Sequence, residues 1–263
     1  MTRLGKAEWW LCDGEKIDTE LRIRQRTMFA ETLKKIPMSL TCFRLNYIRE
    51  PPRRRSYQPE SIIPSGESGD ILSRSFFSFT QRNGLDDFYL EASVDSTILW
   101  PCEKEADANW PSLRVFHIEL NDVLPSGEWV DVRDFDRFGR ITSWVTDEHP
   151  ESEIPGEEYF FEFPSTYDQS IIDKFAFAAG KCLARMLKVN ELNVFHHGHS
   201  DVGLAFNTTD QAQSWPVLEL VGSPDAPEPS EETLEVWKEA VKSHGLEWRI
   251  NITDDLNGVY YFY

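Results

Sequence analysis

Cysteine is scarce in this sequence of 263 residues, and its four cysteines form no recognisable set. Cys12, Cys42, Cys102 and Cys182 are widely spaced, and no two of them form a C-x-x-C pair. Such pairs are typical of structural zinc sites and of redox-active dithiols, whereas scattered cysteines are typical of proteins that keep their thiols reduced. We therefore expect reduced thiols and a cytoplasmic or nuclear protein.

A surplus of positive charge is also lacking. Lys and Arg number 27 against 45 Asp and Glu, which gives a formal net charge of -18. Nucleic acids and anionic membranes bind basic surfaces, so this composition argues against both as partners. No stretch approaches the roughly 20 apolar residues of a membrane span. The segment from Met1 to Lys6 also lacks the apolar core of a signal peptide.

Short catalytic motifs are absent as well. The chain contains no G-x-S-x-G, no glycine-rich phosphate loop and no H-E-x-x-H. Acidic pairs such as Asp254-Asp255 are expected by chance among 45 acidic residues. The sequence therefore names no reaction, and we expect no cofactor.

The most informative pattern is a repeated apolar triplet, Leu-x-x-Phe-x-Ile in its clearest copy. Copies begin at residues 40, 85, 113 and 189, so the intervals are 45, 28 and 76 residues. The triplets are Leu40, Phe43 and Leu45; Leu85, Phe88 and Leu90; Leu113, Phe116 and Ile118; and Val189, Leu192 and Val194. In a leucine-rich repeat this spacing marks a short strand, and the units stack because one alone cannot bury its apolar face. The alternative is a set of ordinary amphipathic strands with irregular spacing.

Helices are predicted ahead of three of the copies and near the C-terminus. The predicted ranges are 19–35, 70–82, 166–187 and 231–243. Leu21, Met28, Thr32 and Leu33 are expected near one face of the first helix. Asp70 and Ser230 are expected as N-caps, and Ser165 or Thr166 as the cap of the third helix. Short polar side chains at these positions can accept hydrogen bonds from the amides of the first turn.

These elements predict one α/β domain over residues 1–263. We expect irregular leucine-rich-repeat-like helix–strand units over about 19–221, forming a partly parallel sheet backed by helices. A helix and a hairpin over about 230–263 are expected to complete the domain, with one hairpin strand at 259–263.

The chain resembles a group of uncharacterised fungal proteins that look like F-box and leucine-rich-repeat proteins. The resemblance covers about residues 20–210 and depends on packing motifs, namely Ile36–Phe43, Leu85–Asp95, Trp110–Phe116 and Ala178–Met186. It implies a substrate-recognition region of an F-box-type adaptor and no catalytic residues. No F-box is found in this sequence, so a ubiquitin-ligase role requires an F-box supplied elsewhere.

The sharpest chemical feature is His196-His197-Gly198-His199. Three of the six histidines fall within four residues, and imidazoles on one side of a strand are ligands that transition metals prefer. His196, His197 and His199 are therefore the candidate metal ligands. The alternative is a turn at Gly198 that is rich in exposed histidine.

Candidate contact residues lie in the predicted loops. Trp100 and Trp144 are expected to be accessible aromatic side chains, and Arg53, Arg54 and Arg55 form a basic run that is either a docking site or a solvated loop. We predict a non-enzymatic protein-interaction module whose partner has a basic surface. The alternative is a small-molecule-binding protein or enzyme with a His-lined site at residues 196–201.

Overall fold

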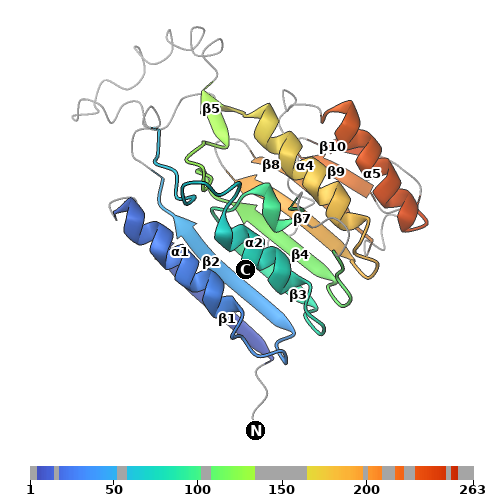
Figure 1. Cartoon of the computed structure of the whole chain (residues 1–263). Coiled ribbons are helices and arrows are strands. Elements are labelled where there is room, and N and C mark those ends of the chain that lie inside the picture. The colour runs from blue at the N-terminus through green and yellow to red at the C-terminus, as the bar shows by residue number, and fades with distance from the viewer. Residues whose placement is uncertain are drawn as a thin grey trace, which may run out of the picture.

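A computed structural model of the chain shows a sheet of eight strands with α-helices on one face (Figure 1). It describes residues 5–14, 18–51, 58–101, 108–133, 165–197, 201–208, 217–221, 229–246 and 250–253. In spatial order the strands are β1 (Lys6–Asp13), β2 (Cys42–Arg49), β3 (Asp87–Ala92), β4 (Val115–Leu120), β7 (Glu191–His197), β8 (Asp201–Asn207), β9 (Val217–Val221) and β10 (Ile250–Thr253). The α-helices are α1 (Thr19–Leu33), α2 (Ile71–Thr80), α4 (Gln169–Leu183) and α5 (Glu231–Ser243).

The first five strands of the sheet are parallel and follow one another in chain order. Strand β8 is antiparallel to both of its neighbours, and β9 and β10 pair in parallel. A parallel neighbour requires a crossover, and α1, α2 and α4 lie in three of these connections. The predicted α/β fold with a partly parallel sheet backed by helices is therefore confirmed.

The four apolar triplets occupy equivalent places in the sheet. Their second residues pair in one line across the strands, Phe43, Phe88, Phe116 and Leu192. Their third residues form the next buried line, Leu45, Leu90, Ile118 and Val194. No side chain in either line is more than 3% exposed. The triplets thus supply two inner rows of the core, and their spacing varies because the connections between strands differ in length.

One backbone arrangement recurs just before these strands. The carbonyl of Gly5 accepts hydrogen bonds from the amides of residues 41 and 42, and the carbonyl of Thr41 accepts from residues 86 and 87. The carbonyls of Asp86 and Arg114 do the same for the following strands. This ladder includes β1, where Ala7 and Trp9 pair with Phe43 and Leu45. Strand β1 is therefore a fifth equivalent unit that the apolar pattern does not reveal.

The helix starts follow local capping chemistry. Asp70 accepts from the Ser73 amide and Ser230 accepts from the Thr233 amide, so both predicted caps are confirmed. The prediction of Ser165 or Thr166 as a cap is wrong. Residues 165–167 form β6 (Ser165–Tyr167), which pairs with β5 (Asp131–Arg133), and Asp168 caps α4. The predicted hairpin strand at 259–263 lies outside the described residues.

Helix α1 faces the sheet differently from the prediction. Leu33 is buried, but Leu21 and Met28 are 45% and 60% exposed. The inward face instead carries Arg22 and Arg26, each 2% exposed. The predicted apolar face is wrong because buried carboxylates elsewhere in the fold neutralise the two guanidinium groups.

Candidate functional site

The face of the sheet opposite the helices carries polar and aromatic side chains. Along each strand alternate residues point to opposite faces, so the residues between the buried apolar positions lie on this face. In β2, β3 and β4 they form two rows, Arg44, Tyr89 and His117, then Asn46, Glu91 and Glu119. In the part of the chain that the structure describes, all four α-helices lie on the other face (Figure 1). We call these six residues the strand-face cluster.

Tyr89 and His117 form the aromatic centre of the strand-face cluster. Their rings are stacked, with centroids 4.5 Å apart and an interplanar angle of 10°. The Tyr89 hydroxyl donates to Oε2 of Glu119 at 3.0 Å. Burial and the adjacent Glu119 carboxylate raise the pKa of Tyr89, so its hydroxyl stays protonated and remains a donor. Stacking covers one face of each ring, and both side chains are half-buried, so a cation can approach only the part of the rings that remains exposed.

Two carboxylates lie side by side next to this stack. Glu91 and Glu119 are direct partners in the pairing of β3 with β4. Like charges in such a position repel, so each gains from a donor. The Asn46 amide donates to Glu91 at 2.5 Å, and Tyr89 donates to Glu119. Both of these donors are uncharged groups.

Arg44 is the cationic residue of the strand-face cluster and lies at the end of its first row. Arg44 Nη2 is 3.8 Å from Oδ2 of Asp87, with both side chains about one third exposed. The Cys42 thiol donates to the same carboxylate. Burial and the Asp87 charge raise the pKa of the Cys42 thiol, which disfavours the thiolate needed for nucleophilic chemistry.

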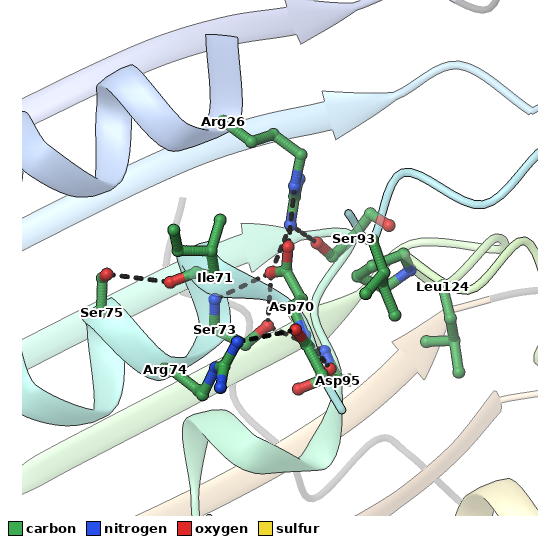
Figure 2. A network of polar contacts seen from close by, with 12 residues as sticks. Arg26, Asp70, Ile71, Ser73, Arg74, Ser75, Ser93, Asp95 and Leu124 are labelled. Atoms are coloured by element: carbon green, nitrogen blue, oxygen red, sulfur yellow. Dashed lines mark hydrogen bonds and ion pairs between the residues drawn. The ribbon is translucent and has the colours of Figure 1, made fainter. Parts of the chain in front are cut away.

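The carboxyl ends of the parallel strands carry a second polar set, and in open α/β sheets this edge is where ligands bind. Here the polar groups contact one another. Arg26 of α1 binds Asp70 through two hydrogen bonds and donates to the carbonyl of Ser93 at 2.9 Å, as Figure 2 shows. Asp95 accepts from the Asp70 amide, and burial together with the Asp70 charge raises the pKa of Asp95.

Two other arginines at this edge are held in the same way. Arg22 binds Asp13, the last residue of β1, at 2.7 and 2.9 Å. Arg49, the last residue of β2, donates to the carbonyls of Leu124 and Glu60. Both arginines are at most 2% exposed. This edge therefore holds the ends of the strands together, and its guanidinium groups are too buried to meet a ligand from solution.

His196 also lies at this edge, on β7. Its Nδ1 is 3.0 Å from the carbonyl oxygen of Leu120, and its Nε2 is 3.3 Å from Oδ1 of Asp131. The histidine and Asp131 side chains are both wholly buried, and Asp122 lies 3.8 Å away. Burial by itself lowers the pKa of His196, but the contact with Asp131 outweighs it and the pKa is raised. Both ring nitrogens face oxygen acceptors, which suits an imidazolium and leaves neither nitrogen directed at a substrate.

The predicted metal site is only partly within the described residues. His196 makes the contacts above, whereas His199 and the side chain of His197 lie outside them. Among the residues that the structure describes, no three His, Cys, Asp or Glu side chains come together as metal ligands. A metal bound by all three histidines stays a prediction.

The predicted contact residues have different outcomes. Trp100 is 7% exposed and belongs to the core, so its prediction as an accessible side chain is wrong. The physical reason is that the Trp100 amide donates to the Ser96 carbonyl at the end of the short helix η1 (Ser96–Ile98), and Ile98, Leu99 and Trp100 are all buried in the core. Trp144 and the run Arg53, Arg54 and Arg55 lie outside the described residues.

Sequence reasoning missed the strand-face cluster although its signal was present. Tyr89 and Glu91 are the residues between and after the apolar positions of one triplet, and His117 and Glu119 are their counterparts in another. Aligning the copies places them side by side. The apolar residues of the triplets do not reveal this cluster, because it consists of the polar residues that alternate with them.

No helix in the described ranges is long and apolar enough to cross a membrane. The chain matches no protein-family model, and neither the curated proteins nor the solved structures contain a significant match to it.

Proposed function

We propose that this protein is a non-enzymatic interaction module that binds an arginine- or lysine-rich segment of a partner protein on the strand-face cluster. The observation that carries the proposal is the pairing of Glu91 with Glu119 beside the stacked rings of Tyr89 and His117. Carboxylates with aromatic rings beside them are groups that arginine binds, by bidentate hydrogen bonds and by cation–π contact.

Long-range electrostatics supports a basic partner. The chain has a formal net charge of -18, which attracts basic segments and speeds their association at low salt. The same charge opposes nucleic acid and anionic membranes. Cytoplasmic or nuclear localisation is part of the proposal, as is the absence of a catalytic reaction.

The parallel part of the sheet also supports recognition. Parallel strands in register place equivalent side chains in rows, so a single face offers many contacts to one extended segment. Within the fungal F-box and leucine-rich-repeat resemblance, this face corresponds to substrate recognition by an F-box-type adaptor. A ubiquitin-ligase role still requires an F-box supplied elsewhere.

The alternative of a small-molecule site around residues 196–201 gains no support from His196. A catalytic histidine needs one ring nitrogen directed at the reacting group. Here Nδ1 contacts the Leu120 carbonyl, and the buried Nε2 lies 3.3 Å from Oδ1 of Asp131. The described part of the fold thus favours recognition over catalysis.

The test is titration of the purified protein with a fluorescent Arg-Ser repeat peptide over about 50 to 300 mM salt. We expect the Glu91→Gln, Glu119→Gln double variant to bind at least about tenfold more weakly, because two charge-assisted contacts are lost. The matched control is Glu31→Gln, Glu235→Gln, which removes the same charge from exposed helix positions. Equal weakening in both variants, or binding that ignores salt, would overturn the proposal.

A further inference from the structure

Strand β1 forms an open edge of the sheet. It pairs with β2 on one side, and it stands first in the order of the described strands. The carbonyls of Gly5 and Asp13 accept bonds from β2, at the amides of Cys42 and Glu50. Backbone groups alternate in direction along a strand, so those of residues 6, 8, 10 and 12 point away from β2. An eight-residue edge of this kind is a template for a further strand.

The side chains at this edge are unusually apolar. Six large hydrophobic side chains are exposed in the described residues, and four of them belong to β1 and α1. Trp10 and Leu11 of β1 are 70% and 43% exposed, and Leu21 and Met28 of α1 are 45% and 60% exposed. Edge strands of sheets usually carry charged side chains or are covered by another segment. Exposed apolar side chains beside such an edge are typical of a surface that another protein covers.

The two exposed residues of α1 lie on the side of the helix nearest this edge. Arg22 binds Asp13 at the end of β1, whereas Arg26 binds Asp70 at the start of α2, and Phe29 packs between β1, β2 and α2. Successive residues turn by about 100° around a helix. Leu21 precedes Arg22 by one residue and is therefore turned from Arg22 away from Arg26 and α2, and Met28, seven residues after Leu21, lies on the same side. Strand and helix thus form one surface, which we call the β1–α1 edge.

Charge identifies the occupant. Four basic and four acidic residues occur in β1 and α1, Lys6, Arg22, Arg24, Arg26, Glu8, Asp13, Glu20 and Glu31. Asp13, Arg22 and Arg26 are buried, so the exposed charged residues of this edge are Lys6, Arg24, Glu8, Glu20 and Glu31, with a net charge of -1 in a chain of net charge -18. This small charge gives a basic partner little attraction to the edge. A second copy meets little repulsion here, and it brings the same edge strand and the same exposed apolar side chains.

We propose that two copies of the chain associate through the β1–α1 edge, with the two β1 strands antiparallel about a two-fold axis perpendicular to the sheet. Antiparallel pairing joins the outward backbone groups around Trp10 of each copy. A perpendicular axis keeps both helix layers on one side, so Leu21 and Met28 of each α1 face the other α1. The contact is isologous and closes at two copies. It joins two sheets and leaves both strand-face clusters on one continuous face.

The experiment is light scattering after size-exclusion chromatography over a range of protein concentrations. We expect the mass to rise with concentration from 30.5 kDa toward twice that value. Leu21→Glu, Met28→Glu should weaken association by about tenfold or more, since charge would enter an apolar contact. Trp10→Glu should act in the same way. Leu187→Glu is the matched control, because Leu187 is 75% exposed but lies after α4.

Two further readouts separate this proposal from the binding of a basic segment. Added salt should strengthen association, because it screens the repulsion between acidic copies, whereas it should weaken peptide binding. Amide exchange at Glu8, Trp10 and Cys12 should slow as protein concentration rises. A mass that stays at 30.5 kDa at every concentration would overturn the proposal. So would a dimer that both edge variants leave intact while circular dichroism shows them folded.

Discussion

Arg26 and Asp70 join the middle of α1 to the N-cap of α2 through two hydrogen bonds of 3.1 and 2.6 Å. Their side chains are 2% and 0% exposed. Asp70 also accepts from the amide and hydroxyl of Ser73, so one carboxylate satisfies both the helix start and the guanidinium. Two connections of the sheet are thereby tied together beneath the surface (Figure 2).

Removal of the Arg26 charge alone should strongly destabilise the protein. In Arg26→Met the Asp70 charge stays buried without its partner, so we expect the free energy of unfolding to fall by about 3–5 kcal/mol. Arg26→Met, Asp70→Asn should lose less, because no lone charge remains. Urea denaturation measures both. Lys34→Met is the control, because its pair with Glu31 is exposed and contributes at most about 1 kcal/mol. A loss in Arg26→Met as small as that in Lys34→Met would contradict the account.

His196 should make stability depend on pH. Its folded pKa is raised above the unfolded value of about 6.5, so the folded state binds more protons. Its contribution is therefore fully present below about pH 6.5 and is lost as pH rises through the folded pKa. We expect the stability difference between wild type and His196→Gln to shrink as pH rises in denaturation experiments. Asp131→Asn should remove most of this dependence. A difference that grows with pH would show that the histidine is neutral in the fold.

The apolar triplets predicted the centre of the sheet because each places large apolar side chains at alternate positions of a strand, which point to the same buried face. The same reasoning overlooked β1, where Ala7 and Trp9 occupy the positions held by Phe43 and Leu45. A small residue and a large aromatic one share no pattern with Phe and Leu. Only the parallel pairing shows that they are equivalent.

The carboxyl edge was beyond sequence reasoning for a different reason. Arg26 is 44 residues from Asp70 in the sequence. An arginine is expected on the surface unless a buried partner for its charge is known, and the sequence does not show that partner. The inward turn of α1 follows from these pairs, and so does the outward turn of Leu21 and Met28. The strand-face cluster was easier to predict from the sequence, because alignment of the triplets places Glu91 beside Glu119.

Gly203 provides a test of packing between β7 and β8. A Cβ at Gly203 would lie 1.9 Å from the ring of Phe195, its partner across the two strands. Phe195 is 2% exposed, so its ring has little room to move. We expect Gly203→Ala to lower the free energy of unfolding by about 1–3 kcal/mol. The control is Gly5→Ala, because a Cβ there meets nothing within 4 Å.

A second substitution distinguishes a clash from a backbone effect. In Gly203→Ala, Phe195→Leu the smaller side chain makes room for the new methyl group. The double variant should therefore be more stable than the sum of the two single losses predicts. Strictly additive losses, measured by thermal or urea unfolding, would show that the ring contact is not the cause.

Reversal of the strand-face charge should reverse partner preference. Glu91→Lys, Glu119→Lys replaces the two paired carboxylates with cations beside the Tyr89–His117 stack. We expect this variant to lose binding to an Arg-Ser repeat peptide and to gain binding to a Glu-Ser repeat peptide, since the local potential changes sign while the net charge stays acidic. Fluorescence anisotropy measures both. Glu31→Lys, Glu235→Lys makes the same change in net charge on the helices and should leave the preference for the basic peptide. If the helix variant also switches preference, total charge and not the strand-face cluster selects the partner.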